Sequence, residues 1–235
     1  MFKNLNSKIA ELIGMHTGDG TIYKTNWSLV WELRGSLDEK AYYYKNVVPL
    51  LKSIFSIDFE PKFRSGGKNG CFGVQTSKKD VINLFISYGF KPGRKTHTAR
   101  IPDYIKKANK EIKFAFIRGL FDTDGCLRFE RINNNKNYTY PKIEFGFASK
   151  NLRDDLLILL DQLGYRCHKW GKINYRLCLA GIDNLEKFIK YVSPKNIKHL
   201  KKFWFWKKYG QCKPRSHSLA IAEISKRSLK KTLDC

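Results

Sequence analysis

The sequence predicts an α+β fold in which one α-β-β-α-β-β-α unit occurs twice. Two observations predict it. The segment ELIGMHTGDGTIYK, residues 11–24, has a counterpart in FIRGLFDTDGCLRF, residues 116–129, and their acidic residues Asp19 and Asp124 lie 105 residues apart. The apolar patterns that follow the two segments also occur in the same order. We therefore expect two similar lobes in one chain.

Each repeated segment begins as a helix, because apolar residues recur at helical spacing, and it ends at a glycine suited to helix termination, Gly20 or Gly125. Two β-like runs, an amphipathic helix, two more runs and a third helix follow. In the first half these span residues 21–24, 28–35, 38–55, 58–64, 71–77 and 78–90; in the second they span 126–132, 141–149, 151–164, 165–170, 175–181 and 182–192. Strands adjacent in sequence favour antiparallel sheets with helices on one face, which leaves the opposite face for a partner.

The stretch between the two halves is rich in Lys, Pro and Gly, and the end of the chain is basic and aromatic. We therefore expect an N-terminal lobe over residues 1–95, a linker over 96–110, a C-terminal lobe over 111–200, and a helix with a loose tail over 201–235.

The charge of the chain favours nucleic acid as the partner. Lys plus Arg number 45 against 21 for Asp plus Glu, a formal net charge of +24 over 235 residues. Anionic membrane is the rival, but no apolar run approaches the roughly 18 residues that span a bilayer, and the start of the chain lacks an apolar signal core. The sequence predicts an intracellular protein with access to DNA, in the cytoplasm or an organelle. The six cysteines lack zinc-ligand spacing, so they indicate no metal site.

Asp19 and Asp124 each stand at the end of a predicted helix, where the macrodipole disfavours a carboxylate by a few tenths to about 1 kcal/mol. A cation offsets that cost. The same helix ends expose unpaired carbonyls, so the carbonyls of Gly18 and Thr123 are candidate ligands beside the two acids. Oxygen ligands alone suit Mg²⁺. An Asp-Gly turn explains either acid by itself, but the repetition and the net charge favour metal chemistry.

Small residues at four-residue spacing predict that the two repeated helices pack together. Gly14 with Gly18, and Gly119 with Thr123, leave room for close approach of another helix backbone. Such packing brings the two acids side by side at the seam between the lobes. That arrangement suits two-metal catalysis of phosphodiester hydrolysis, with ions about 4 Å apart.

At these residues the sequence resembles the LAGLIDADG homing endonucleases, with LIGMHTGDG (12–20) and IRGLFDTDG (117–125) in place of the two family motifs. The segments GSLDEKAYYY, TSKKD, KPGRK, IPDYI and NIKH look like the intron- and intein-associated branch with two motifs in one chain. The resemblance extends along essentially the whole sequence. It implies a pseudo-two-fold monomer whose motif helices form the lobe interface and whose two sheets form a saddle along the major groove of a long double-stranded DNA site.

The resemblance also implies a reaction: a double-strand break with 3′ overhangs. The metal ligands map to Asp19, Asp124, Gly18 and Thr123, and the basic residues that organise the attacking water map to Lys95 and Lys198. The sequence departs from the family pattern at Thr17, where an acid is often found two residues before the metal ligand. We expect Mg²⁺ as cofactor, with Mn²⁺ as a substitute and Ca²⁺ supporting binding without efficient cleavage.

Alternation along the strands predicts which side chains face the DNA. Arg can read guanine, Asn or Gln adenine, and Lys mostly contacts phosphate. The candidates are Tyr23, Lys24, Asn26, Ser28, Arg34, Lys62, Arg64, Gln75, Arg128, Glu130, Arg131, Lys172 and Arg176. His16 and the aromatic cluster at residues 203–206 are more typical of packing than of chemistry or base stacking.

Two other functions remain open at this point. An RNA-splicing maturase for its own intron does not require Asp19 or Asp124, and the net positive charge of the chain suits intron RNA equally well. A DNA-binding regulator derived from a nuclease is expected to have lost at least one acidic ligand, and here both are present.

Overall fold

The computed structural model describes residues 4–65, 70–132 and 136–212. The N-terminal lobe contains α1 (Ser7–Gly18), β1 (Gly20–Lys24), β2 (Leu29–Gly35), η1 (Leu37–Glu39), α2 (Lys40–Tyr42), η2 (Tyr43–Val47), α3 (Val48–Phe55), β3 (Lys62–Arg64), β4 (Cys71–Thr76) and α4 (Lys79–Ser87). After α5 (Asp103–Lys106), the C-terminal lobe contains α6 (Lys110–Asp124), β5 (Gly125–Glu130), β6 (Tyr140–Phe147), α7 (Lys150–Gln162), β7 (His168–Trp170), β8 (Tyr175–Ala180) and α8 (Ile182–Tyr191), followed by α9 (Ile197–Tyr209). The repeated unit and the α+β class are confirmed.

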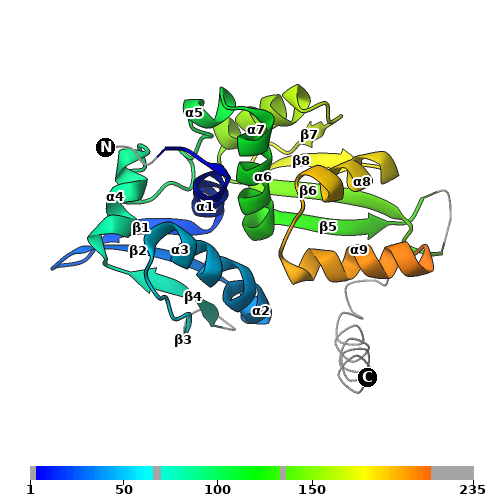
Figure 1. Ribbon diagram of the computed structural model, residues 1–235. Helices are drawn as coiled ribbons and strands as arrows, with labels where there is room; N and C mark the ends of the chain where they lie inside the picture. The colour runs from blue at the N-terminus through cyan, green and yellow to red at the C-terminus, as the bar shows by residue number, and fades with distance from the viewer. Residues whose placement is uncertain (1–3, 66–69, 133–135, 213–235) are drawn as a thin grey trace, which may run out of the picture.

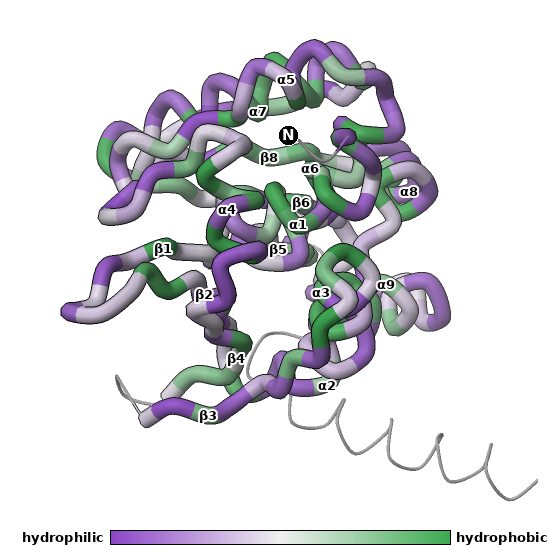
Figure 2. Tube along the Cα trace, turned by 60° about the vertical axis from the view of Figure 1, so that its left-hand side comes forward, coloured by the Kyte–Doolittle hydropathy of each residue, from purple (hydrophilic) through white to green (hydrophobic). Residues whose placement is uncertain are grey.

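Each lobe contains one four-stranded antiparallel sheet, and the two sheets have the same topology. Their strand orders are β1-β2-β4-β3 and β5-β6-β8-β7. Helices cover one face of each sheet, and α1 and α6 lie side by side at the centre, between the lobes (Figure 1). Green, hydrophobic positions mark α1 in this central place, whereas the edge strand β3 is mainly purple (Figure 2).

Glycines allow the two central helices to pack closely. A Cβ atom added at Gly14 would collide with the carbonyl oxygen of Phe116, and one added at Gly119 would collide with that of Glu11. Backbone therefore meets backbone across the seam, as the small-residue spacing predicts. Apolar side chains of α1 such as Leu12 and Ile13 are fully buried.

Three elements differ from the sequence expectation for local reasons. The predicted helix over 38–55 is continuous but contains a π-helical segment, η2, just before Pro49, whose ring lacks an N–H donor and crowds the carbonyl four residues earlier. The predicted strand over 58–64 is shortened to β3, which begins directly after Pro61. The strand expected over 165–170 is likewise shortened to β7, and Tyr165, just before it, is buried in the core.

The segment between the lobes contains one short helix, α5, which the sequence analysis did not predict. It begins after Pro102, and Ile105 anchors it in the core. The basic aromatic end forms α9, which begins at Ile197 and packs beside β5 through Phe203 and Trp206. Residues 213–235 of the expected tail lie outside the described residues. Within the described ranges, no helix combines the length and the apolarity that a bilayer crossing requires.

Candidate active site

The two acids of the repeated motifs meet where α1 and α6 end. Asp19 caps α1 directly after Gly18, and Asp124 is the last residue of α6. A Cβ atom added at Gly18 would lie 3.3 Å from Oδ2 of Asp124 and would collide with the hydroxyl of Thr123. The carboxylate of one motif thus lies against the helix end of the other. Two residues far apart in sequence form one acidic site at the lobe seam.

The electrostatics of this pair are those of a site prepared for a cation. The surrounding protein raises the pKa of Asp19 well above its usual range, and the charges of Asp124 and Glu39 raise it further. The pKa of Asp124 is raised too, by the same loss of water contact. Lys95 and Lys198 oppose both shifts without cancelling them. Asp19 nevertheless stays open to solvent on one side, so an ion can reach the pair.

The donor set fits a hard divalent cation. Two carboxylates and the terminal carbonyls of two helices supply oxygen atoms only, which is the chemistry of Mg²⁺ sites. Among the residues that the structure describes, no three His, Cys, Asp or Glu side chains lie close enough together to hold a metal ion by themselves. Gly18 and Thr123 lie at the ends of α1 and α6, and the role of their carbonyls as metal ligands stays a prediction.

A lysine from the segment after α4 is anchored to the end of α1. The Nζ atom of Lys95 donates hydrogen bonds to the carbonyl oxygens of Thr17 (2.7 Å) and Gly18 (2.6 Å). Loss of solvent lowers the pKa of Lys95, while the charges of Asp124 and Asp19 act in the opposite direction. Lys95 therefore places a positive charge beside the acidic pair.

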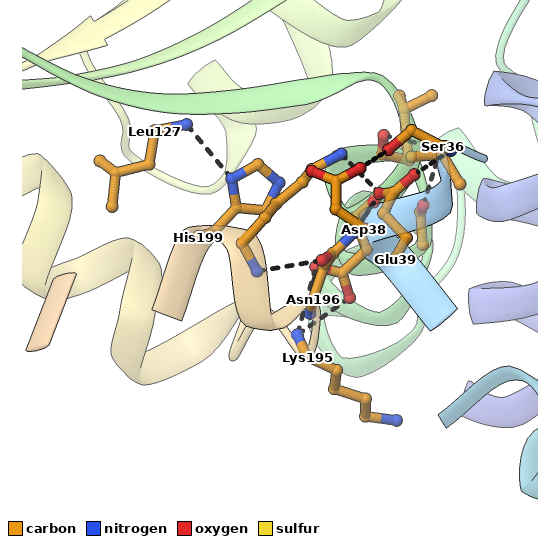
Figure 3. Close-up of polar contacts among 12 residues, drawn as sticks. Ser36, Asp38, Glu39, Leu127, Lys195, Asn196 and His199 are labelled. Atoms are coloured by element: carbon orange, nitrogen blue, oxygen red, sulfur yellow. Dashed lines mark hydrogen bonds and ion pairs between the residues drawn. The ribbon is translucent and has the colours of Figure 1, made fainter. Parts of the chain in front are cut away.

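Lys198 approaches the same acids from the other lobe and has a different anchor. Its Nζ atom lies 2.8 Å from Oε1 of Glu39, and Nδ2 of Asn196 donates to the same oxygen at 2.6 Å. Glu39 belongs to the N-terminal lobe, whereas Asn196, labelled beside it in Figure 3, directly precedes α9, and Lys198 is the second residue of α9. The sequence analysis did not identify Glu39 or Asn196. The S-x-x-E capping pattern at Ser36 marks Glu39 locally, but a local pattern cannot reveal a contact 157 residues away.

The residue two positions before each acid has a structural role. Asp122 is completely buried and accepts hydrogen bonds from the backbone N–H groups of Lys195 and Asn196. Burial raises its pKa to about 7 against the effect of those bonds. At the matching position, the hydroxyl of Thr17 donates a hydrogen bond to the carbonyl oxygen of Ile13. The departure at Thr17 therefore leaves the acidic pair intact.

One face of each sheet is turned away from the helices; we call it the open face. In the N-terminal lobe it carries Thr21, Tyr23, Glu32, Arg34, Lys62, Arg64, Cys71 and Gln75, as the strand register shows. Glu32 pairs with Arg34 at 2.5 Å and lies 3.7 Å from Arg64. Nε2 of Gln75 donates to the hydroxyl of Tyr23. These contacts hold polar side chains in fixed positions across the sheet.

The open face of the C-terminal lobe carries Cys126, Arg128, Glu130, Lys142, Glu144, His168, Trp170 and Arg176. Arg128 pairs with Glu130 at 2.7 Å and with Glu144 at 2.6 Å. A groove of about 770 Å³ runs over this face and reaches Asp124 at its inner end, with Trp170, Asn174 and Arg176 on its walls. Lys142 and Glu144 alternate along β6 with the buried Ile143 and Phe145. This pattern could have added them to the predicted DNA-contacting residues.

Five of the predicted DNA-contacting residues lie off the two open faces. Lys24 pairs with Leu29, so it points to the side opposite Tyr23. Asn26 and Ser28 belong to the β1–β2 turn, Lys172 to the β7–β8 turn, and Arg131 follows β5 and stacks on the ring of Tyr138. His16 accepts a hydrogen bond from the indole of Trp31 and packs against Phe85, as expected of a core residue.

Known proteins share the fold of this chain. Residues 111–193 match the model of the LAGLIDADG-like domain. The match to the structure of the homing endonuclease I-DmoI in complex with DNA and Mn covers 80% of this chain and 97% of the I-DmoI chain, with a TM-score of 0.55 and 18% sequence identity. The homing endonuclease I-WcaI bound to its DNA recognition sequence covers 85% of this chain and 87% of its own, with a TM-score of 0.55 and 17% identity. I-DmoI was also solved with DNA and Ca.

Curated relatives share part of the sequence. An uncharacterized protein of Methanocaldococcus jannaschii is 32% identical over 51% of this chain, and a tRNA-splicing ligase of Methanopyrus kandleri is 30% identical over 49% of it. A probable translation initiation factor of Methanocaldococcus jannaschii is 28% identical over 75% of it. The matched segment is only 13–14% of each of these relatives. Residues 111–193 therefore resemble a LAGLIDADG-like domain, and the chain as a whole has the double-lobed fold seen in the homing endonucleases I-DmoI and I-WcaI.

Proposed function

We propose that this protein is a site-specific DNA endonuclease that makes a metal-dependent double-strand break and leaves 3′ overhangs. The observation that carries the proposal is the meeting of Asp19 and Asp124 at one seam, with Lys95 and Lys198 beside them. Solved neighbours that share the fold include I-DmoI in complex with DNA and Mn and in complex with DNA and Ca. Because one chain supplies both lobes, it acts as a monomer on double-stranded DNA.

The open faces are the surface that we assign to the duplex. The groove over the open face of the C-terminal lobe reaches Asp124, and the basic residues on the two open faces neutralise phosphate or read base edges. The two acids would hold Mg²⁺, or Mn²⁺ in its place, together with the Gly18 and Thr123 carbonyls, and a bound ion would supply Lewis-acid stabilisation of negative charge at the scissile phosphate. Lys95 and Lys198 orient water and stabilise developing charge through their ammonium groups.

The variety of proteins that contain similar segments supports a role in homing. Segments like this one form a small part of a ligase and of an initiation factor, proteins whose names share no activity. A segment common to such different proteins is better explained as an inserted element than as part of either activity. We therefore assign the chain to an intron or intein, with residues 1–95 and 111–200 as its two lobes and 96–110 as linker. No observation favours intron RNA as a partner, so the maturase alternative is not proposed.

The test uses the joined flanks of the interrupted gene as substrate. The protein is incubated with this duplex and Mg²⁺ beside the variants Asp19→Asn and Asp124→Asn, and both DNA strands are followed by end labels. We expect cleavage of both strands by the wild type, its loss in either variant, and retained DNA binding in all three. Intact duplex after incubation with the folded wild type contradicts the proposal.

A further inference from the structure

The two lysines at the acidic site are held in unequal ways. Among the described residues, Lys95 donates hydrogen bonds to carbonyl oxygens of its own lobe, those of Thr17 and Gly18. Lys198 crosses the seam and forms an ion pair with Glu39, a carboxylate of the opposite lobe. The two lobes therefore differ in how their lysines are held at the acidic site.

The Glu39 carboxylate is held by a contact within its own lobe as well as by Lys198. Its Oε2 atom accepts from the backbone N–H of Ser36 at 2.8 Å, as part of the capping box that begins η1. Its Oε1 atom accepts from Asn196 and from Lys198. The Glu39 residue is only 6% exposed, and its contacts with Ser36 and Asn196 are drawn in Figure 3, so the carboxylate has a defined position.

At the position that corresponds to Glu39, the C-terminal lobe has no carboxylate. Ser149 occupies the corresponding helix start, where its hydroxyl accepts from the backbone N–H of Leu152. The residue three positions after this serine is Leu152, which is buried in the core, whereas the residue three positions after Ser36 is Glu39. An apolar side chain cannot anchor Lys95, which takes the helix-end carbonyls instead.

We infer that Glu39 is a positioning residue that holds Lys198 at the acidic pair, and that cleavage of one DNA strand depends on it while cleavage of the other does not. The inference rests on the proposed function. The Lys198 side chain is 32% exposed and flexible, so without the ion pair its ammonium can swing into solvent. Asn196, two residues before Lys198, donates from Nδ2 to the backbone carbonyl of Asp122 at 2.8 Å, which brings this chain segment to the end of α6 that carries Asp124. The charge of Lys198 also lowers the pKa of both Asp19 and Asp124. Glu39 acts on the site in two ways: its ion pair holds Lys198, and its charge raises the pKa of Asp19.

The experiment is Glu39→Gln, which keeps the shape and an acceptor for Ser36 but removes the charge. Cleavage of a duplex labelled differently on each DNA strand is followed in single turnover. We expect one DNA strand to be cut at least 10-fold more slowly and the other within about 3-fold of the wild-type rate, so that nicked duplex accumulates. Lys198→Met should slow the same DNA strand, and adding Glu39→Gln to it should change little, because both changes remove one interaction. Asp38→Asn, on the same turn, is the matched control and should nick no more than the wild type.

The outcomes separate this inference from the proposed function. A wild type that cuts both DNA strands, with Glu39→Gln slowing both equally, overturns the positioning role and leaves the nuclease standing. A folded wild type that cuts neither DNA strand overturns both. If Glu39→Gln is unfolded by circular dichroism, Glu39→Asp replaces it, since a shortened carboxylate loses reach to Lys198 and should give the same bias toward one DNA strand.

Discussion

The Nζ atom of Lys95 lies 2.6 Å from the carbonyl oxygen of Gly18, at the end of α1. This carbonyl is one of the oxygen atoms that a helix end leaves without an intrahelical partner. A second bond, to Thr17 at 2.7 Å, fixes the ammonium in the same place. The charge of Lys95 is therefore fixed beside Asp19 by backbone atoms and does not depend on another side chain.

Lys95→Met is expected to slow cleavage by about 100-fold or more, because it removes a fixed charge from the site of developing negative charge. DNA affinity should change less than 5-fold, since one lysine among many basic residues contributes little to binding. Single-turnover rates and dissociation constants measured in Ca²⁺ check this. Lys91→Met, an exposed lysine of the same segment, is the control. A normal rate for Lys95→Met would remove Lys95 from the mechanism.

Gly14→Ala and Gly119→Ala are expected to lower the free energy of unfolding by about 3 kcal/mol or more. Each added methyl group would collide with a backbone carbonyl of the facing helix, and backbone cannot move aside as a flexible side chain does. Urea unfolding followed by circular dichroism measures the loss. Gly146→Ala is the matched control, because its methyl group would meet only Arg176, at an ordinary 3.6 Å. Equal stability of all three variants is the result that disproves close helix packing.

Much of this fold could be predicted from periodicity, and the exceptions have specific causes. The four-residue spacing of Gly14 with Gly18, and of Gly119 with Thr123, predicts the central helix pair, because close backbone contact requires small residues. The role of Glu39 could not be predicted, because its partners Asn196 and Lys198 come from a loop and a helix start in the other half. Lys95 and Lys198 themselves entered only through family resemblance, since neither stands in a pattern that specifies its target.

Arg176 and Lys172 are expected to contribute differently to DNA binding. Arg176 lies on the open face and lines the groove near Asp124, so Arg176→Ala should reduce discrimination at one base pair by about 1–3 kcal/mol. Lys172 lies in a turn, so Lys172→Ala should weaken all sites alike and reduce the salt slope by about 1. Binding to duplexes with single base-pair changes, at several salt concentrations, distinguishes the two. Uniform weakening by both substitutions would reject base reading by Arg176.

His199 is expected to make the fold less stable in acid. Burial lowers the pKa of this histidine well below its usual range, and Lys198 and Lys202 lower it further. The unfolded chain therefore binds a proton below about pH 6.5 that the folded chain refuses, and each further pH unit costs up to about 1.4 kcal/mol. His199 stacks on Phe121, so His199→Phe keeps an aromatic ring there and removes the titration.

The measurement for His199 is the difference in unfolding free energy between wild type and His199→Phe, taken from pH 7.5 to 5. The difference should shift in favour of the variant as the pH falls. His168→Phe on β7, where the side chain is exposed, serves as the comparison. A difference that stays constant with pH would show that His199 is not kept neutral by the fold.

The most direct test of the central claim is to locate Mn²⁺ by anomalous X-ray scattering in crystals of the protein bound to its DNA. The account predicts a signal at the seam, within about 2.5 Å of carboxylate oxygens of Asp19 and Asp124, and its loss in the Asp19→Asn, Asp124→Asn double variant. Mn²⁺ found only at sites remote from both carboxylates, in crystals where the DNA lies across the open faces, would contradict it.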